Sequence, residues 1–529
     1  MLKLSPQSYD WALKHLLGEY DTDLFPLPFE VLSIDTLWGS LSEEFERLDL
    51  SNYTWRGGRR FIVPKNLLAF RAATQLDPVD SLVMTALIYE HGAKLESSRL
   101  PTSEKRVFSY RFAPSPDGRL YANNAAWQDF WSESKKKATT SPCEFVVITD
   151  ISDFYNQIYH HVLERHFDTI ALDEPVATAI KKYLQTLTDK VSRGVPVGPH
   201  TSHIFAECAL DSMDRSLLSH GYDFCRYVDD VHIFVKDHTS AVGALYDFAQ
   251  ILDSQQRLII QKEKTQILPV ADFVKLADKM LIDRPLNAQE AIILNVINRL
   301  SGGDPYAQLS LAALRDEDVQ KLSKDILERL ISIYLSQGEV DYARLAWLLR
   351  RLAQVGAPGA VNIVISNLQS LSPILGPVAR YLTMSIKNYT GDCVALGDDV
   401  VKALDTPIIS RSPYLQVVLL DILANLPELN HVDRVTARFN SSDPAVKREI
   451  IRVAESGKRR DWLRDRKQDF RVMDPWTRRA FVRAASVFPP VEGKFWVDSV
   501  RDSLRPIERA IAKNAIPTAK VGEFRIVME

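Results

Sequence analysis

The stretch Tyr227-Val228-Asp229-Asp230 places two adjacent carboxylates at the tip of a predicted strand-turn-strand, between Phe224-Cys225 and the apolar run 231–235. Neighbouring like charges repel and raise each other's pKa values, so a fold tolerates them best where a divalent cation neutralises both. The alternative is a solvated turn between two strands. The pair therefore points to a metal site at the tip of a hairpin.

A third carboxylate follows another predicted strand. The β-branched run Val146-Val147-Ile148-Thr149 ends in Asp150. Three carboxylates on adjacent strands can hold two Mg²⁺ ions about 3.5–4 Å apart, which activates an attacking hydroxyl and stabilises a leaving pyrophosphate. Mn²⁺ could replace Mg²⁺. We predict Asp150, Asp229 and Asp230 as the catalytic residues and metal ligands of a nucleotide-polymerising site.

Composition permits this chemistry without requiring it. The chain has 529 residues, 46% hydrophobic and 25% charged, as expected for a globular protein of two or three domains. The four cysteines have no paired spacing, so they indicate neither a zinc site nor a disulfide framework, and a reducing cytoplasm fits best. No apolar stretch approaches the roughly 20 residues that span a bilayer, so we expect a cytoplasmic protein without membrane contact. Because the net charge is −3, nucleic-acid binding would need local clusters of basic residues.

The secondary-structure signals divide the chain into three regions. Residues 1–142 mix short helical patterns with loops rich in proline and glycine, whereas residues 143–270 alternate strands and helices. In residues 271–529 amphipathic segments follow one another every 15–20 residues or so, as in helix-pair repeats. Four of these helices are expected to start at a capping residue followed by proline: Ser372-Pro373, Ser412-Pro413, Asp443-Pro444 and Asp474-Pro475. The predicted fold is α+β, followed by an all-α, HEAT-like repeat domain.

Three motifs in order resemble the palm of reverse transcriptases. The first is Asp150 followed by Phe154-Tyr155; the second is the loop 193–202, with its Gly-Val-Pro-Val-Gly core; the third is the segment 258–265, which ends in Lys264-Thr265. The resemblance implies fingers in residues 1–142 and a palm in residues 143–270. It also implies that Tyr155 lies against the 2′ carbon of the sugar and so favours deoxynucleotides.

The same resemblance implies further contacts. The backbone carbonyl of Ile151 would be a metal ligand. The nucleotide would be bound by residues of the three motifs and by basic residues of the fingers: Asp153, Phe154, Tyr155, Val197, Gly198, Lys264, Lys65, Arg71 and Arg111. Ordinary packing is the alternative for the two aromatic residues, and surface charge is the alternative for the fingers cations.

The sequence departs from the reverse transcriptase pattern at Val197 and in its N-terminal region, which lacks the usual strand-turn signature with basic residues before an Arg-Pro step. Val197 stands where templated reverse transcriptases have a glutamine that seats the nucleotide by hydrogen bonds, which valine cannot make. The loop 196–203, the segment 21–26 and the helical tail in place of a thumb resemble the abortive-infection group of bacterial reverse transcriptase-like proteins, most of all its prophage-encoded type. That group implies template-independent DNA synthesis primed by a protein hydroxyl, a homo-oligomer, and a single-stranded DNA product attached to the protein. The priming candidates are Tyr9, Tyr20 and Tyr53.

Two other functions stay open: a templated, retron-like reverse transcriptase, and a non-catalytic interaction protein that senses nucleotides.

A basic stretch in the helical half bears on product binding. Residues 443–483 contain 13 Lys or Arg against 7 Asp or Glu, with aromatic residues between them. This pattern predicts a nucleic-acid track, with a salt-bridged, solvated helix face as the alternative. The track would use Arg459, Arg460, Arg464, Arg466 and Lys467.

Overall fold

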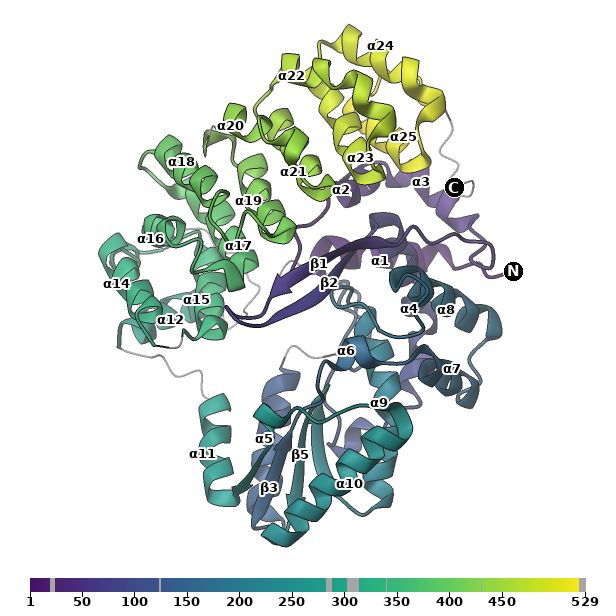
Figure 1. The fold of residues 1–529 in the computed structure, drawn as a ribbon, viewed down its shortest axis with the longest axis vertical. Helices are drawn as coiled ribbons and strands as arrows, with labels where there is room; N and C mark the ends of the chain where they lie inside the picture. Colours follow the sequence, from purple (N-terminus) through teal and green to yellow (C-terminus); the bar gives the residue numbers. More distant parts are fainter. Residues whose placement is uncertain are drawn as a thin grey trace.

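The computed structural model describes residues 1–19, 24–122, 125–281, 288–301, 314–338, 340–429 and 431–522. A small sheet with its helices forms one end of the molecule, a β-hairpin among helices forms the middle, and an arched array of helices forms the other end (Figure 1). The predicted fold class is confirmed: an α+β unit is followed by an all-α region.

The palm sheet is antiparallel and has four strands in the order β4-β5-β3-β6. Val146 of β3 pairs with Phe234 of β5, and both lie on the face covered by Phe130 and Phe273. Val147 and its partner Ile233 lie on the opposite face, in the main core. The sheet is therefore buried on both sides. Its strands are β3 (Phe145–Thr149), β4 (Asp223–Tyr227), β5 (Asp230–Val235) and β6 (Gln266–Pro269).

Four helices cover this sheet. Helices α5 (Ala126–Thr140) and α11 (Val270–Leu281) pack on one face and on each other, while α9 (Ser202–Ser219) and α10 (His238–Gln256) cover the other. The predicted boundaries at 142 and 270 separate α5 and α11 from the sheet that they cover. In the structure the palm layer therefore includes α5 and α11 together with the sheet.

The fingers are more regular than their loop-rich sequence indicates. Antiparallel strands β1 (Gly58–Pro64) and β2 (Phe70–Leu76) form a hairpin, which begins inside the stretch Arg56–Arg60 that the sequence favours as a loop. Seven helices complete this region: α1 (Pro6–Glu19), α2 (Phe29–Thr36), α3 (Trp38–Glu46), α4 (Pro78–Glu96), α6 (Phe154–Gln157), α7 (His160–Thr169) and α8 (Glu174–Leu187).

Past residue 287, the described residues form a two-layer helical array. In one layer each helix contacts the next of the series: α15 (Tyr342–Val355), α17 (Leu375–Ser385), α19 (Pro413–Asn425), α21 (Pro444–Ser456), α23 (Pro475–Ala484) and α25 (Pro506–Ala515). The remaining helices are α12 (Ala288–Ser301), α13 (Asp316–Lys321), α14 (Lys324–Leu335), α16 (Val361–Ser366), α18 (Cys393–Ala403), α20 (Val432–Thr436), α22 (Arg460–Asp465) and α24 (Pro490–Val500). This is the helix-pair arrangement that the spacing of amphipathic segments predicts.

The capping signals are confirmed at three of the four positions. Ser412, Asp443 and Asp474 accept hydrogen bonds from backbone N–H groups in the first turns of α19, α21 and α23. Ser372 instead begins a short 3₁₀ turn, and α17 follows it at Leu375. Ser372-Pro373 thus marks a helical start one turn before the α-helix itself.

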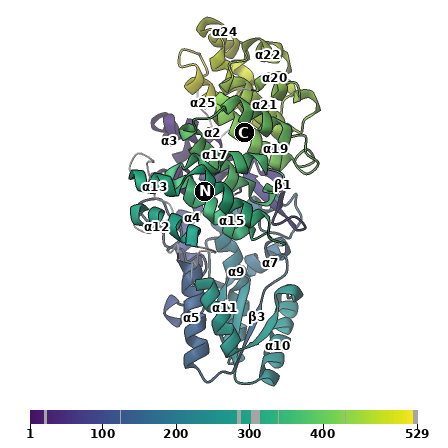
Figure 2. The ribbon, with the colours of Figure 1, turned by 90° about the vertical axis from the view of Figure 1, so that its left-hand side faces the viewer.

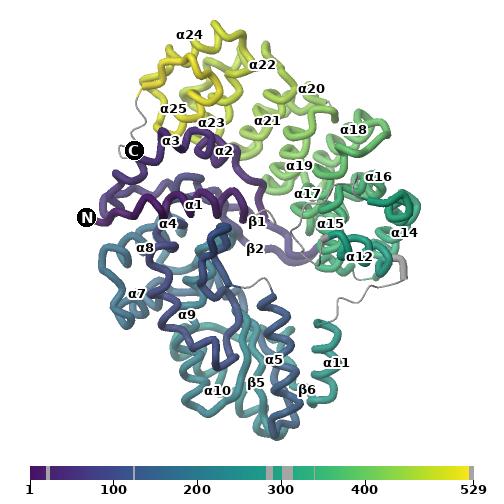
Figure 3. Tube along the Cα trace, turned by 180° about the vertical axis from the view of Figure 1, so that it is seen from behind, coloured from purple at the N-terminus to yellow at the C-terminus, as the bar shows by residue number. Residues whose placement is uncertain are grey.

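The helical array arches over the fingers hairpin (Figures 1 and 3) and is fastened to the fingers by buried ion pairs. Arg448 of α21 lies 2.8 Å from Glu30 of α2, and Arg479 of α23 lies 2.6 Å from Asp77, which precedes α4. All four side chains are at least 96% buried. In the view turned by 90° the array and the palm lie at opposite ends of an elongated molecule (Figure 2).

Candidate active site

The three aspartates come together because two strands end at the same edge of the sheet. Asp150 follows β3 directly, and Thr149 pairs with Val231, the second residue of β5. The β4–β5 turn holds Val228 and Asp229, between the paired residues Tyr227 and Asp230. The ligand oxygens of Asp150, Asp229 and Asp230 all lie within 4.8 Å of one another. The sequence-predicted acids therefore form one cluster.

The turn that carries Asp229 is held in an unusual conformation. Val228 has a φ of +53°, in the left-handed region that β-branched residues rarely adopt. Its N–H donates to Ser109 Oγ at 2.9 Å, and its carbonyl accepts from Arg226 at 2.9 Å. These two contacts fix the direction of the hairpin tip.

Arg226 is a positioning residue that sequence reasoning missed. It is 1% exposed and pairs with Asp214 at 2.6 Å and with Glu207 at 3.0 Å, both on α9. Glu207 also accepts a hydrogen bond from Arg99 at 2.6 Å. An arginine inside a buried strand needs acidic partners. Glu207 and Asp214 are seven residues apart and so lie on one face of a helix, and this spacing is the sequence pattern that indicates such partners.

Burial and mutual repulsion make the acid cluster unfavourable without a cation. Burial raises the pKa of Asp229 to about 6, and the carboxylate of Asp150 adds to the shift. Burial likewise raises the pKa of Asp230 to about 7, with Asp229 and Asp150 contributing. Oxygen ligands in this number suit Mg²⁺ or Mn²⁺, so the residues present fit the divalent metals that reverse transcriptases use.

Lys264 is the cation nearest this cluster. Its ammonium nitrogen lies 2.5 Å from Asp150 Oδ2, although 61% of the side chain is exposed. Burial lowers the pKa of Lys264, but the hydrogen bond to Asp150 outweighs this and leaves it above its usual value. Lys264 ends a 3₁₀ turn, Lys262–Lys264, and β6 follows this turn.

Tyr155 lies beside the cluster in an aromatic group. Its hydroxyl is 2.7 Å from Nδ1 of His203, at the start of α9. The His203 ring stacks on Tyr110 with a centroid distance of 3.7 Å and an angle of 2°. Burial lowers the pKa of His203 to about 4 and raises that of Tyr155 well above its usual value. Both groups are therefore neutral at physiological pH.

The loop with Val197 and Gly198 rests on the fingers hairpin. The carbonyl of Val197 accepts from the N–H of Thr74 in β2 at 2.7 Å. Gly198 has a φ of +126°, and a Cβ there would lie 2.6 Å from the Thr74 carbonyl oxygen. The glycine is therefore required by contact with β2, and the predicted nucleotide contacts of Val197 and Gly198 stay predictions.

The remaining nucleotide-binding predictions fall into different surroundings. Lys65 is exposed at the hairpin turn, and its charge acts on Asp229. Arg71 is half-buried on β2, and its charge acts on His203. Asp153 is exposed and accepts from Asn156 and Gln157 at 2.7 and 2.9 Å. Lys65 and Arg71 thus face the site region, whereas Asp153 is engaged within its own turn.

The side chains of three further predicted site residues are buried in the core or already hydrogen-bonded. Phe154 is 2% exposed and belongs to the hydrophobic core. Arg111 donates to Glu96 at 2.9 Å and to the carbonyls of Leu100 and Val107 at 2.8 Å, so its guanidinium is already engaged. Ile151 is fully buried and bridges to Ile260, and its carbonyl as a metal ligand stays a prediction.

Two of the three priming candidates are buried. Tyr9 is 1% exposed against Phe45. Tyr53 is 9% exposed, and its hydroxyl donates to Asp80 at 2.8 Å. A priming hydroxyl must reach the acid cluster, and burial in the core prevents this for both residues in the structure as it stands. Tyr20 lies outside the described residues, directly after Glu19.

The basic stretch of the helical array is largely neutralised by acids. Arg464 and Lys467 both pair with Glu492, at 2.7 Å, and Arg459 pairs with Asp433. Arg466 lies over the Trp462 ring at 5.1 Å and 3.9 Å from Asp469, and Arg460 donates to the Val487 carbonyl at 3.3 Å. These contacts match the alternative of a salt-bridged helix face, and the nucleic-acid track stays a prediction.

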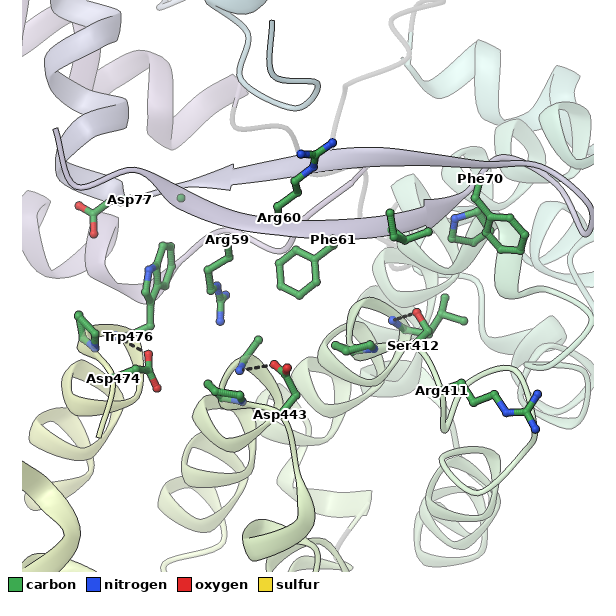
Figure 4. Close-up of a pocket in the computed structure, with 18 of the residues that line it drawn as sticks. Arg59, Arg60, Phe61, Phe70, Asp77, Arg411, Ser412, Asp443, Asp474 and Trp476 are labelled. Carbon is green, nitrogen blue, oxygen red and sulfur yellow. Dashed lines mark hydrogen bonds between the residues drawn. The ribbon is translucent and has the colours of Figure 1, made fainter. Parts of the chain in front are cut away.

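Two large cavities lie beside the helical array. One, of about 1430 Å³, lies between palm, fingers and array and is lined in part by Tyr110, His203 and Tyr227. The other, of about 1260 Å³, lies between β1 and the starts of α19, α21 and α23 (Figure 4). Arg59 and Phe61 point toward these helices, whereas Arg60 points away from them (Figure 4). Neither cavity is lined by the three aspartates, so only the first adjoins the chemistry, through Tyr227.

Residues 97–280 match the family described as reverse transcriptase (RNA-dependent DNA polymerase). The chain contains a reverse transcriptase domain. The matched range includes the three aspartates, Tyr155, the Val197–Gly198 loop and Lys264, and it ends within α11, as the palm layer does. No curated protein matched the chain.

Solved structures similar to the chain are telomerases of Candida species. Apo telomerase from Candida tropicalis shows 10% identity over 80% of this chain and 69% of that chain, with a TM-score of 0.33. Telomerase from Candida albicans with a fragment of telomeric RNA shows 12% identity over 75% and 66%, with a TM-score of 0.31. A C-terminally truncated Candida tropicalis telomerase is matched over only 50% of its length. These values carry no argument about activity, and the domain assignment rests on the family match.

Proposed function

We propose that this protein is a template-independent, protein-primed DNA polymerase of the reverse transcriptase family that acts in abortive-infection defence against phages. The observation that carries the polymerase reaction is the cluster of Asp150, Asp229 and Asp230 inside the matched domain. Bound at these residues, two Mg²⁺ ions, or Mn²⁺ in their place, would activate the attacking hydroxyl and neutralise the leaving pyrophosphate.

The chain's own residues prepare a deoxynucleoside triphosphate for this step. Tyr155, held by His203, fills the space that a ribose 2′-hydroxyl would need. Lys264 bonds Asp150 and is exposed enough to turn toward a triphosphate. Lys65 and Arg71 of the hairpin add positive charge from the fingers side.

Template independence is supported by Val197 and by the helical array. The Val197 side chain offers no hydrogen bond for seating a template, and its carbonyl is already bonded to Thr74. Where other family members have a thumb, the described chain has an array joined to the fingers by the Glu30–Arg448 and Asp77–Arg479 pairs. This is the departure that resembles the abortive-infection group.

Priming and product attachment follow from the same resemblance. With Tyr9 and Tyr53 buried, Tyr20 is the remaining candidate of the three, and we propose it as the residue that carries the single-stranded DNA product. We further propose a cytoplasmic homo-oligomer. No described helix is both long and apolar enough to cross a bilayer.

Incubation with dNTPs and Mg²⁺ alone tests the proposal. Product formed without primer or template supports untemplated synthesis, whereas product that requires added RNA and is complementary to it supports the retron-like alternative. Binding of nucleotides without turnover supports the sensing alternative. Mass spectrometry of the purified protein then locates any covalent nucleotide: on Tyr20 in the wild type, and lost in Tyr20→Phe.

A further inference from the structure

Outside the aspartate cluster, three other metal-ligand side chains converge. His15 and Glu19 lie one turn apart at the end of α1, and His200 lies in the loop that precedes α9. Their ligand atoms all lie within 4.8 Å of one another. The three residues also line a cavity of about 40 Å³, which is room for one ion or water.

His15 makes the kind of hydrogen bond that metal-binding histidines make. Nδ1 of His15 lies 2.7 Å from the Gly118 carbonyl. A carbonyl only accepts, so Nδ1 carries the proton and Nε2 keeps the free lone pair. Metal-binding histidines usually donate their other ring N–H to a carbonyl or carboxylate in this way. His15 is 2% exposed, so this orientation is fixed by packing.

His200 has an unused ligand atom. Nδ1 of His200 is buried and has no hydrogen-bond partner among the described residues. The carboxylate of Glu19 is half-buried, and the charges of Arg119 and Asp117 act on it. A buried nitrogen left without a partner is unfavourable, so a bound ligand would stabilise this cluster.

The three side chains lie close together without hydrogen-bonding to one another. The rings of His15 and His200 are 5.3 Å apart between centroids and tilted by 59°, and no hydrogen bond joins the three residues. Two imidazoles and a carboxylate, with one position left for water, form a common zinc ligand set. Zinc ligands lie about 2.0–2.2 Å from the metal, so the side chains would move inward slightly; Glu19, at the helix end, has room to do so.

We propose that His15, Glu19 and His200 bind one Zn²⁺ ion. The ion would tie α1 to the loop that runs from Gly198 to His203. Gly198 anchors this loop on β2, and His203 holds Tyr155. Zinc would thus fix the loop that lies beneath the nucleotide. This role rests on the proposed polymerase function, whereas zinc binding itself does not.

Metal content of the full-length protein tests the proposal. Protein stripped with a chelator and equilibrated with Zn²⁺ in Mg²⁺-containing buffer is desalted and analysed by mass spectrometry of the metal. We expect about one zinc per chain, and a visible absorption band of tetrahedral type when Co²⁺ replaces it. His15→Ala, Glu19→Gln and His200→Ala should each weaken zinc binding by at least about tenfold.

Two controls separate this site from others. His220→Ala removes an exposed histidine far along α9 and should leave zinc binding unchanged. Asp229→Asn should abolish nucleotide incorporation yet keep the zinc, so failure of the polymerase proposal and failure of the zinc proposal are distinguishable. Because Glu19 is half-buried at a helix end, Glu19→Gln should fold, which circular dichroism can verify.

Three results would overturn the proposal: no zinc retained by the wild type, unchanged zinc affinity in folded Glu19→Gln, or loss of the zinc in Asp229→Asn. The first would leave the cavity with an ordered water only. The last would place the metal at the aspartate cluster.

Discussion

The phenolic oxygen of Tyr155 lies 2.7 Å from Nδ1 of His203, and the His203 ring lies flat on Tyr110. The bond joins the first palm motif to the first turn of α9. Because both groups are neutral at physiological pH, the contact does not depend on a charge that a small pH change would remove. Tyr155 is therefore held at one position beside the acid cluster.

From this contact we predict that sugar selection depends on His203 as well as on Tyr155. Tyr155→Ala opens the space for a 2′-hydroxyl and should raise incorporation of rNTPs relative to dNTPs by up to about a hundredfold. His203→Ala should raise the ratio less, because the Tyr155 ring remains and loses only its hydrogen bond to His203. Competition between labelled rNTP and dNTP measures both ratios. An unchanged ratio in active Tyr155→Ala would mean that another residue excludes the ribose.

The raised pKa values of Asp229 and Asp230 predict a pH-dependent stability of the metal-free protein. The folded chain keeps these protons to about pH 6 and 7, whereas the unfolded chain loses them near 3.8. This stabilising contribution is thus complete below pH 3.8 and is lost as the pH rises through 6 and 7.

Urea unfolding with a chelator checks this expectation. Between pH 5 and pH 8 the free energy of unfolding of the wild type should fall by about 2 kcal/mol relative to Asp230→Asn. Mg²⁺ should restore the wild type at pH 8, because the metal binds the deprotonated acids. A difference between the two proteins that does not vary with pH would contradict the coupling of these carboxyls.

We predict that Lys264 leaves Asp150 and contacts the triphosphate when a nucleotide binds. Lys264→Met removes a charge-assisted hydrogen bond of about 1.5–3 kcal/mol, so the KM for dNTP should rise by about tenfold or more. The Mg²⁺ concentration for half-maximal rate should not rise, since a cation that competes for Asp150 is gone. Lys262→Met, in the same turn, is the matched control, and equal effects of both variants would argue for a general charge effect.

Gly198 is predicted to be indispensable for loop placement. Gly198→Ala would put a Cβ against the Thr74 carbonyl at a φ that favours glycine, and should destabilise the protein by about 1–3 kcal/mol and lower activity. Gly243→Ala on α10, where nothing lies within 4 Å of the added carbon, should keep wild-type stability and activity. Chemical denaturation and dNTP incorporation measure the two effects, and a fully active, fully stable Gly198→Ala would refute this role.

Local patterns predicted the parts of the site that depend on strand ends. A β-branched run before Asp150 and apolar residues around Tyr227–Asp230 placed the acids where β3 and β4 end and β5 begins. The proline-capped helices were predictable for the same reason, since a cap involves residues two or three positions apart. The helices α5 and α11 were misplaced because their packing on the sheet depends on distant residues.

What sequence reasoning missed depends on partners far along the chain. The basic stretch was counted over residues 443–483, but Arg464 and Lys467 pair with Glu492, and Arg459 pairs with Asp433, both outside that window. Arg111 and Tyr53 look available in sequence, yet Glu96 and Asp80 engage them. Short patterns do not show which charged or polar groups meet in the fold.

The central claim is that Asp150, Asp229 and Asp230 catalyse nucleotide transfer without a template. The most direct measurement is incorporation of labelled dNTP by purified protein with Mg²⁺ and no primer or template, in the wild type and in Asp229→Asn. We expect labelled, protein-linked product from the wild type, none with a chelator, and none from folded Asp229→Asn. Product of near wild-type yield from Asp229→Asn, or product only when an RNA template is added, would contradict the account.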